Sequence, residues 1–221
     1  MFSLTNYKHI IWDWNGTLLD DLAITIKTIN RILNNYHLPA VTKEQYLQIF
    51  DFPVRECYEK MGLDFTVVDF KEVADSFARE FERLVVSCNL QAGAIAVLEQ
   101  FARLKIPQSM LSATYRKDLL PFVQKFEIDH YFQEICGLQN NHADSKIEIG
   151  KCLMEKLNIS PKEVILFGDT IHDYQTAQAM GTDCILIAAG HQTRQKLEKC
   201  GVPVLESLQE LLEEEKISLA K

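Results

Sequence analysis

Residues 9–18 read HIIWDWNGTL, and this stretch decides the fold. His9–Trp12 is apolar and contains β-branched residues, which predicts a buried strand. Asp13 follows that strand directly, and Asn15-Gly16-Thr17 then has the residue types of a tight turn. The stretch therefore predicts a strand that carries a carboxylate at its carboxyl end, where the chain turns sharply.

Strands and helices alternate again after Asn89. Val164–Phe167 and Cys184–Ile187 are apolar runs typical of buried strands, and Gln108–Leu111 is a short strand pattern that ends near Ser112. Apolar spacing predicts helices over five further ranges: Gly93–Leu104, Lys117–Phe126, Lys146–Leu157, His172–Met180 and Leu205–Lys216. Apolar strands that alternate with helices indicate an α/β fold with a doubly wound parallel sheet.

Between the first strand and Asn89 the pattern is helical. Residues 22–33 place leucine and isoleucine at helical spacing, residues 42–45 (TKEQ) resemble a capped helix start, and Asp69–Val86 is amphipathic. This region shows no strand pattern, so we expect an all-helical insert in the α/β core. The expected boundaries are residues 1–18 and 89–221 for the core and residues 19–88 for the insert.

The chain has 221 residues and a formal net charge of −8, which disfavours nucleic acid and anionic membranes as partners. Its N-terminal residues lack the pattern of a signal peptide, and no apolar stretch reaches the roughly 20 residues of a membrane helix. The six cysteines form no CxxC pair, which favours reduced thiols over zinc or disulfide sites. We expect a cytoplasmic protein that is a monomer or a homodimer.

Polar residues gather where the predicted strands end. In open α/β sheets this edge binds ligands, and the candidates there are Asp13, Asn15, Ser112, Asp169 and Asp173. Helix N-capping would explain any one of them alone. Carboxylates that converge at one edge repel each other, however, and they need a hard cation such as Mg²⁺. A carboxylate beside that cation can act as a nucleophile toward a phosphoryl group.

Gly16 and Lys146 fit the same chemistry. Gly16 lets the backbone turn closely, so that neighbouring N–H groups could face a phosphate oxygen. Lys146 begins a predicted helix, where the helix dipole disfavours a cation. Nearby carboxylates or a phosphate would compensate it, and the alternative is an exposed surface lysine.

These residues carry a family resemblance. Asp13–Leu18 (DWNGTL) closely resembles the first motif of the haloacid dehalogenase superfamily, DxDGTL, and Gly168–Asp173 (GDTIHD) looks like its fourth, GDxxxD. Ser112 looks like the second motif and Lys146 like the third, and the order along the chain is right. The resemblance covers nearly the whole chain. It implies a Rossmann-like core with a small helical cap, as in the phosphoglycolate phosphatase group.

The resemblance also implies roles for these residues. Asp13 would be the nucleophile that forms an aspartyl-phosphate, and Ser112 and Lys146 would hold the phosphoryl oxygens. The implied Mg²⁺ ligands are Asp13, the backbone carbonyl of Asn15, Asp169 and Asp173. The implied substrate-binding residues are Gly16, Thr17, Ser112, Ala113, Lys146 and, on the cap, Arg55. The implied activity is magnesium-dependent hydrolysis of a small phosphorylated metabolite, a phosphate monoester.

Asn15 departs from the family pattern. The family's phosphatases have an aspartate there, which protonates the leaving group and then activates water, and an amide does neither. Since general acid–base catalysis contributes about 10²–10⁴-fold, we expect slow turnover rather than none. The resemblance implies that Asn15→Asp would accelerate hydrolysis. His172 is a conceivable substitute for the missing acid, although a solvent-facing position on its helix is the simpler expectation.

Two other functions remain open. The chain could be a catalytically weak, phosphate-binding or regulatory relative. It could also cleave a phosphonate, which needs a cap lysine that forms an imine; the comparable stretch offers Arg55, which stays protonated, although Lys43 and Lys60 keep the option open. The Asp169–Asp173 pair argues against a metal-free dehalogenase, and the helical insert argues against a response-regulator receiver.

Overall fold

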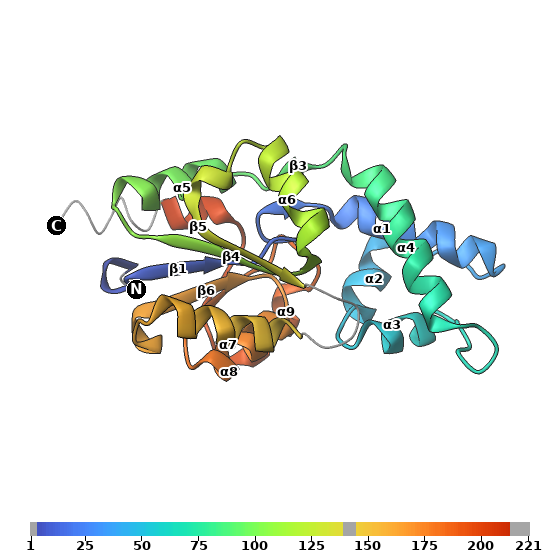
Figure 1. Cartoon of the computed structure of the whole chain (residues 1–221). Coiled ribbons are helices and arrows are strands. Elements are labelled where there is room, and N and C mark those ends of the chain that lie inside the picture. Colours follow the sequence, from blue (N-terminus) through green and yellow to red (C-terminus); the bar gives the residue numbers. More distant parts are fainter. Residues whose placement is uncertain (1–3, 139–144, 213–221) are drawn as a thin grey trace.

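The computed structural model describes residues 4–138 and 145–212, and its centre is a six-stranded sheet in which each adjacent pair is parallel (Figure 1). The strand order is β5-β4-β1-β6-β7-β8. The strands are β1 His9–Trp12, β4 Gln108–Tyr115, β5 Phe132–Leu138, β6 Val164–Gly168, β7 Asp183–Ile187 and β8 Val204–Leu205. The chain adds strands first on one side of β1 and then on the other, so the predicted doubly wound sheet is confirmed.

Helices cover both faces of this sheet. They are α5 Ala94–Arg103, α6 Arg116–Lys125, α7 Lys146–Leu157, α8 Ile171–Met180 and α9 Arg194–Leu197, with short 3-10 turns at Leu4–Asn6, Asp129–Tyr131, Pro161–Glu163 and Glu198–Cys200. Side chains alternate along β1, so Ile10 packs on the α5 and α6 face, whereas Ile11 packs with Leu153 and Ala177 on the α7 and α8 face. Both faces of β1 are therefore buried, which explains its apolar run Ile10–Trp12.

The helical insert lies beyond the carboxyl ends of the strands (Figure 1). It consists of α1 Leu22–Asn35, α2 Lys43–Ile49, α3 Val54–Lys60 and α4 Phe70–Val85, which surround their own apolar cluster. Thr42 and Gln45 form the capping box expected at the start of α2. Two short antiparallel strands, β2 Leu19–Asp20 and β3 Asn89–Leu90, join the insert to the core. The domain boundaries remain our prediction.

Some elements differ from the sequence expectations. The insert region was expected to show no strand, but β2 and β3 bracket it; two residues each are too few to make a pattern. Strands β5 and β8 were also missed, because β5 is only partly buried and β8 has two residues. Strand β4 continues three residues past Ser112, where its pairing with β5 is irregular.

The C-terminal helix starts later than predicted. Leu205 belongs to β8, and helical backbone begins at Leu208. Residues 213–216 of the predicted range lie outside the described residues. Within the described part of the chain, none of the helices has the length and apolar character needed to span a bilayer.

Candidate active site

Three carboxylates meet at the carboxyl edge of β1 and β6. We call Asp13, Asp169 and Asp173 the carboxylate cluster; all are buried, and one oxygen from each lies within 4.8 Å of the others. The Asp13 N–H donates to the Phe167 carbonyl at 2.9 Å, which extends the β1–β6 pairing by one residue. Asp169 follows β6, and Asp173 lies in the first turn of α8. The topology thus brings together residues that are far apart in the sequence.

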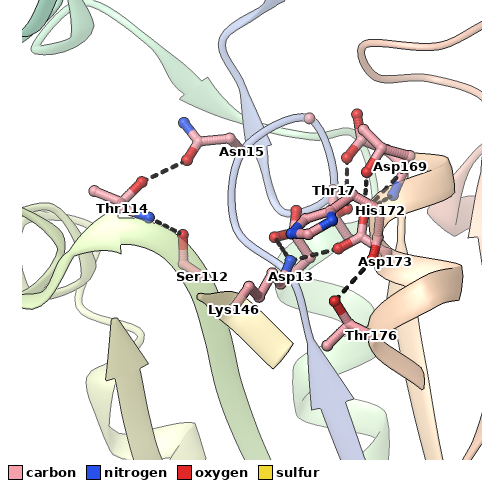
Figure 2. A network of polar contacts seen from close by, with 12 residues as sticks. Asp13, Asn15, Thr17, Ser112, Thr114, Lys146, Asp169, His172, Asp173 and Thr176 are labelled. Atoms are coloured by element: carbon pink, nitrogen blue, oxygen red, sulfur yellow. Dashed lines mark hydrogen bonds and ion pairs between the residues drawn. The ribbon is translucent and has the colours of Figure 1, made fainter. Parts of the chain in front are cut away.

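Lys146 lies against this cluster. Its ammonium group forms ion pairs with Asp13 and with Asp173 (Figure 2), and only 4% of the residue is exposed. The exposed-lysine alternative is therefore wrong, and carboxylates compensate the cation at the start of α7. Burial lowers the pKa of Lys146, but the two carboxylates outweigh burial and raise it, so the side chain stays protonated.

The carboxylate cluster carries more negative charge than Lys146 balances. Burial raises the pKa of Asp13 to about 6; the Lys146 ammonium opposes this rise, and Asp173 adds to it. Burial likewise raises the pKa of Asp169 well above its usual value; His191 opposes this rise, and Asp13 and Asp173 add to it. Three buried carboxylates beside one ammonium group leave an excess of two negative charges when all are ionised. An oxygen-only donor set with this excess fits a hard divalent cation such as Mg²⁺.

Two glycines make room for Asp169. A Cβ atom on Gly16 would lie 2.2 Å from Asp169 Oδ2, and one on Gly190 would lie 2.0 Å from it. Gly16 also has φ +75°, a conformation that favours glycine. The same Asp169 oxygen accepts the His191 N–H at 2.6 Å. Gly16 therefore shapes the carboxylate cluster, in addition to the expected turn.

Asn15 follows Asp13 by two residues, and both ends of its side-chain amide have partners. Its Nδ2 donates to Asp21 Oδ2 at 2.9 Å. Its Oδ1 accepts the Thr114 hydroxyl at 2.7 Å (Figure 2). Thr114 also donates its N–H to Ser112 Oγ at 3.0 Å. Asn15 is therefore held in one orientation between α1 and β4.

A buried ion pair continues from Asn15. His191 Nε2 lies 3.1 Å from Asp21 Oδ1, and His191 Nδ1 lies 2.9 Å from the Tyr46 hydroxyl on α2. Burial would lower the pKa of His191, but Asp21 raises it to about 9; burial raises and His191 lowers the pKa of Asp21, and the net result is a lowered value. Both groups are therefore charged near pH 7. We call the run Thr114, Asn15, Asp21, His191 and Tyr46 the amide chain.

The other predicted site residues are placed as follows. Ser112 is buried next to the amide chain, and Ala113 is exposed. The Thr17 hydroxyl lies 3.5 Å from Asp169 Oδ1. His172 stacks on Phe52 of the cap at 4.5 Å between ring centroids, and burial, with Lys146, lowers its pKa. His172 is therefore half-buried against the cap rather than fully exposed to solvent.

Arg55 is placed within the cap. Its Nε lies 3.3 Å from Glu59 Oε1, and its guanidinium carbon lies 5.1 Å from the centroid of the Phe65 ring. About half of its side chain is exposed. Its recorded contacts in the described residues are all to other cap residues, so a role in substrate binding stays a prediction.

A cleft of about 790 Å³ lies elsewhere, between α1 and α4, with Lys27, Arg31 and Glu80 in its lining. It shares no residue with the carboxylate cluster or the amide chain. We place the candidate active site at the carboxylates because they carry the chemistry. Asp21, His191, Thr114 and Tyr46 were not foreseen, since no spacing in the sequence relates them.

A family model described as haloacid dehalogenase-like hydrolase matches residues 10–187, which confirms the resemblance inferred from the motifs. The chain is 23% identical over 80% of its length to a phosphorylated carbohydrates phosphatase of Thermotoga maritima, covering 82% of that protein. It is 24% identical over 85% of its length to a phosphoglycolate phosphatase of Haemophilus influenzae, covering 88% of it.

Not every relative is named as a phosphatase. The chain is also 23% identical over 89% of its length to the tyrosine-protein kinase PtkA of Mycobacterium tuberculosis, and covers 67% of it. Among solved structures, a haloacid dehalogenase-like hydrolase from Streptococcus pneumoniae superposes with a TM-score of 0.78 at 18% identity, over 94% of this chain and 98% of that one. This likeness establishes the fold.

Proposed function

The chain belongs to the haloacid dehalogenase-like hydrolase family, and from this premise we propose that it is a magnesium-dependent phosphatase of a small phosphate monoester that forms an aspartyl-phosphate on Asp13. The observation that carries the proposal is the buried carboxylate cluster with Lys146 at the strand edge. Relatives named as phosphatases support the same chemistry. A bound Mg²⁺, held by Asp13, Asp169, Asp173 and the Asn15 carbonyl, would neutralise phosphate charge.

The reaction has two displacements at phosphorus. An Asp13 oxygen attacks, the bond from phosphorus to the ester oxygen breaks, and the alcohol leaves after it gains a proton. Water then attacks the aspartyl-phosphate, the bond from phosphorus to the Asp13 oxygen breaks, and phosphate and the free carboxylate result. Lys146 and the Ser112 hydroxyl are the groups that would hold phosphoryl oxygens during both steps.

Asn15 limits both steps. Its amide supplies no proton to the leaving alcohol and removes none from the attacking water, so water itself must do both. We therefore propose slow turnover with ordinary alcohols, with the hydrolysis of the intermediate slowed as well. The bound substrate is a small phosphorylated metabolite, and the cap of residues 19–88 would exclude water and select it. We keep cytoplasmic location and a monomer or homodimer as parts of the proposal.

The test is phosphate release from p-nitrophenyl phosphate, with and without Mg²⁺. This ester has a good leaving group, so Asn15 handicaps the first step least. We expect release that needs Mg²⁺ and that Asp13→Ala abolishes, while Asp129→Asn, which alters an exposed aspartate, keeps it. An intact mass increase of one phosphoryl group after rapid acid quench would identify the intermediate. Release that persists in Asp13→Ala would overturn the proposal.

One observation favours a second function. Because Thr114 and Asp21 already occupy both ends of the Asn15 amide, the site is well suited to hold phosphate without turning it over. A catalytically weak phosphate-binding relative would bind inorganic phosphate in the presence of Mg²⁺ and would release none from any ester. Phosphonate cleavage gains no such support, since Lys43 and Lys60 are both exposed.

A further inference from the structure

We propose that Asp21 is a positioning residue of the proposed phosphatase, and that its buried carboxylate makes a neutral amide the group required at position 15. This inference rests on the proposed function for its catalytic consequence only. According to this proposal, Asn15 does more than lack the acid function of an aspartate. Its amide is the hydrogen-bond partner that the buried Asp21 carboxylate requires.

The partners of Asp21 carry the argument. Its Oδ2 accepts from Asn15 Nδ2 at 2.9 Å and from the Thr25 hydroxyl at 3.2 Å. Its Oδ1 accepts from the Gly16 N–H at 2.8 Å and lies 3.1 Å from His191 Nε2. A carboxylate offers about four acceptor positions, and four donors fill them here. Only 1% of Asp21 is exposed, so water is not available to replace a lost donor.

A carboxylate at position 15 would not fit this arrangement. It would face Asp21 at hydrogen-bond distance with no hydrogen atom between the two carboxylates. The substitution would also remove Asn15 Nδ2, one of the four donors to Asp21. The Thr114 hydroxyl holds the other end of the residue 15 side chain, so rotation would lose that bond as well. Asn15→Asp alone should therefore damage the site instead of accelerating it, contrary to the expectation from the family resemblance.

Asp21 also connects Asn15 to two more distant groups. Its partner His191 donates its backbone N–H to Asp169 of the carboxylate cluster, and its ring contacts Tyr46 of α2 in the cap. A shift of Asp21 would therefore move both the turn at Gly16 and a proposed metal ligand. This is how a residue that does not itself reach the substrate could change the rate.

The experiment is a double-mutant cycle on the full chain with Asn15→Asp, Asp21→Asn and the combined variant. In the combined variant the carboxylate and the amide exchange places, so the amide at position 21 can still accept from the Gly16 N–H and donate to the carboxylate at position 15. We measure the melting temperature and the kcat and KM for p-nitrophenyl phosphate. Asp69→Asn is the matched control, because Asp69 is the N-cap of α4 as Asp21 is the N-cap of α1, but Asp69 is exposed.

We expect each single variant to lower the melting temperature by roughly 10 °C and kcat by roughly 10- to 100-fold with a smaller change in KM. The combined variant should recover most of both, and Asp69→Asn should change neither. Additive losses, or an Asn15→Asp variant that is faster and fully stable, would overturn the inference. If wild type releases no phosphate, the proposed function fails, yet coupled melting temperatures would still establish the Asn15–Asp21 pairing.

A milder cycle covers the case in which Asn15→Asp does not fold. Asn15→Ala removes the donor without adding charge. We expect the loss of melting temperature caused by Asp21→Asn to be smaller in the Asn15→Ala background than in wild type. Equal losses in both backgrounds would mean that the two side chains act independently, which would overturn the pairing.

Discussion

Two buried polar groups of residues meet at Asp169, and they differ in charge balance. The carboxylate cluster holds three carboxylates against the single ammonium of Lys146. The amide chain holds one carboxylate, Asp21, against one imidazole, His191, and its remaining members are neutral. The first group has an excess of negative charge that a bound cation would balance, whereas the charges of the second group balance each other. The difference separates a binding site from the framework that holds it in place.

The largest effect we expect is on catalysis at the carboxylate cluster. Asp13→Asn removes the proposed nucleophile, so phosphate release should fall by at least about 10⁴-fold. Without metal, the same change should leave the melting temperature unchanged or raised, because it removes one repelling charge. Asp21→Asn should instead lower it. A metal-free Asp13→Asn protein that melts well below wild type would break the comparison.

Removal of the Lys146 ammonium group should destabilise the carboxylate cluster. Lys146→Met leaves three buried carboxylates with no ammonium partner, and the loss of one member of a buried pair costs about 3–5 kcal/mol. We expect that loss of unfolding free energy in urea without Mg²⁺, and a smaller loss with it. Lys151→Met, on an exposed position of the same helix, is the control and should change stability by less than about 1 kcal/mol.

The ion pair of the amide chain predicts a pH dependence. The pKa of His191 is raised from 6.5 to about 9 in the folded protein, so its stabilisation is fully present below pH 6.5 and is lost as pH rises through 9. The loss should be roughly 3 kcal/mol. It would be measured by urea unfolding between pH 6.5 and 9.5. His191→Gln should flatten this slope, and His130→Gln, at an exposed position, should leave it unchanged.

The smallest expected effect is stabilisation by the cation itself. Mg²⁺ at about 100 times its dissociation constant should add about 2.7 kcal/mol to the unfolding free energy. Asp169→Asn should remove most of this gain, whereas Asp129→Asn should keep it. An Mg²⁺ response that is the same in both variants would place the cation outside the carboxylate cluster.

Much of the core was predictable because its signals are local. The apolar runs at β1, β6 and β7 are long enough to identify, and the polar residues that end them have a known place in parallel sheets. The resemblance of DWNGTL and GDTIHD to family motifs added the order of the site. Lys146 was foreseen through the same order, and its burial is what the structure adds.

The amide chain was not predictable, for a physical reason. Asp21 and His191 are 170 residues apart and contact each other only because the loop after β7 returns over the start of α1. No periodicity or residue spacing in the sequence indicates such a contact. From the sequence alone, Asn15 is therefore a departure from a family pattern, and only the structure shows its hydrogen-bond partners.

The strand order also bears on how the chain is made. His9 of β1 pairs with Val164 of β6, a partner about 155 residues later in the sequence. At roughly 5–20 residues per second, β1 waits on the order of 10–30 s before that partner is synthesised. During this interval Ile10, Ile11 and Trp12 are unpaired on one edge, whereas the apolar cluster of the cap has all of its residues once Phe77 is synthesised. Nascent chains should therefore expose an apolar, aggregation-prone first strand. A chaperone that binds this strand would raise the yield of folded protein.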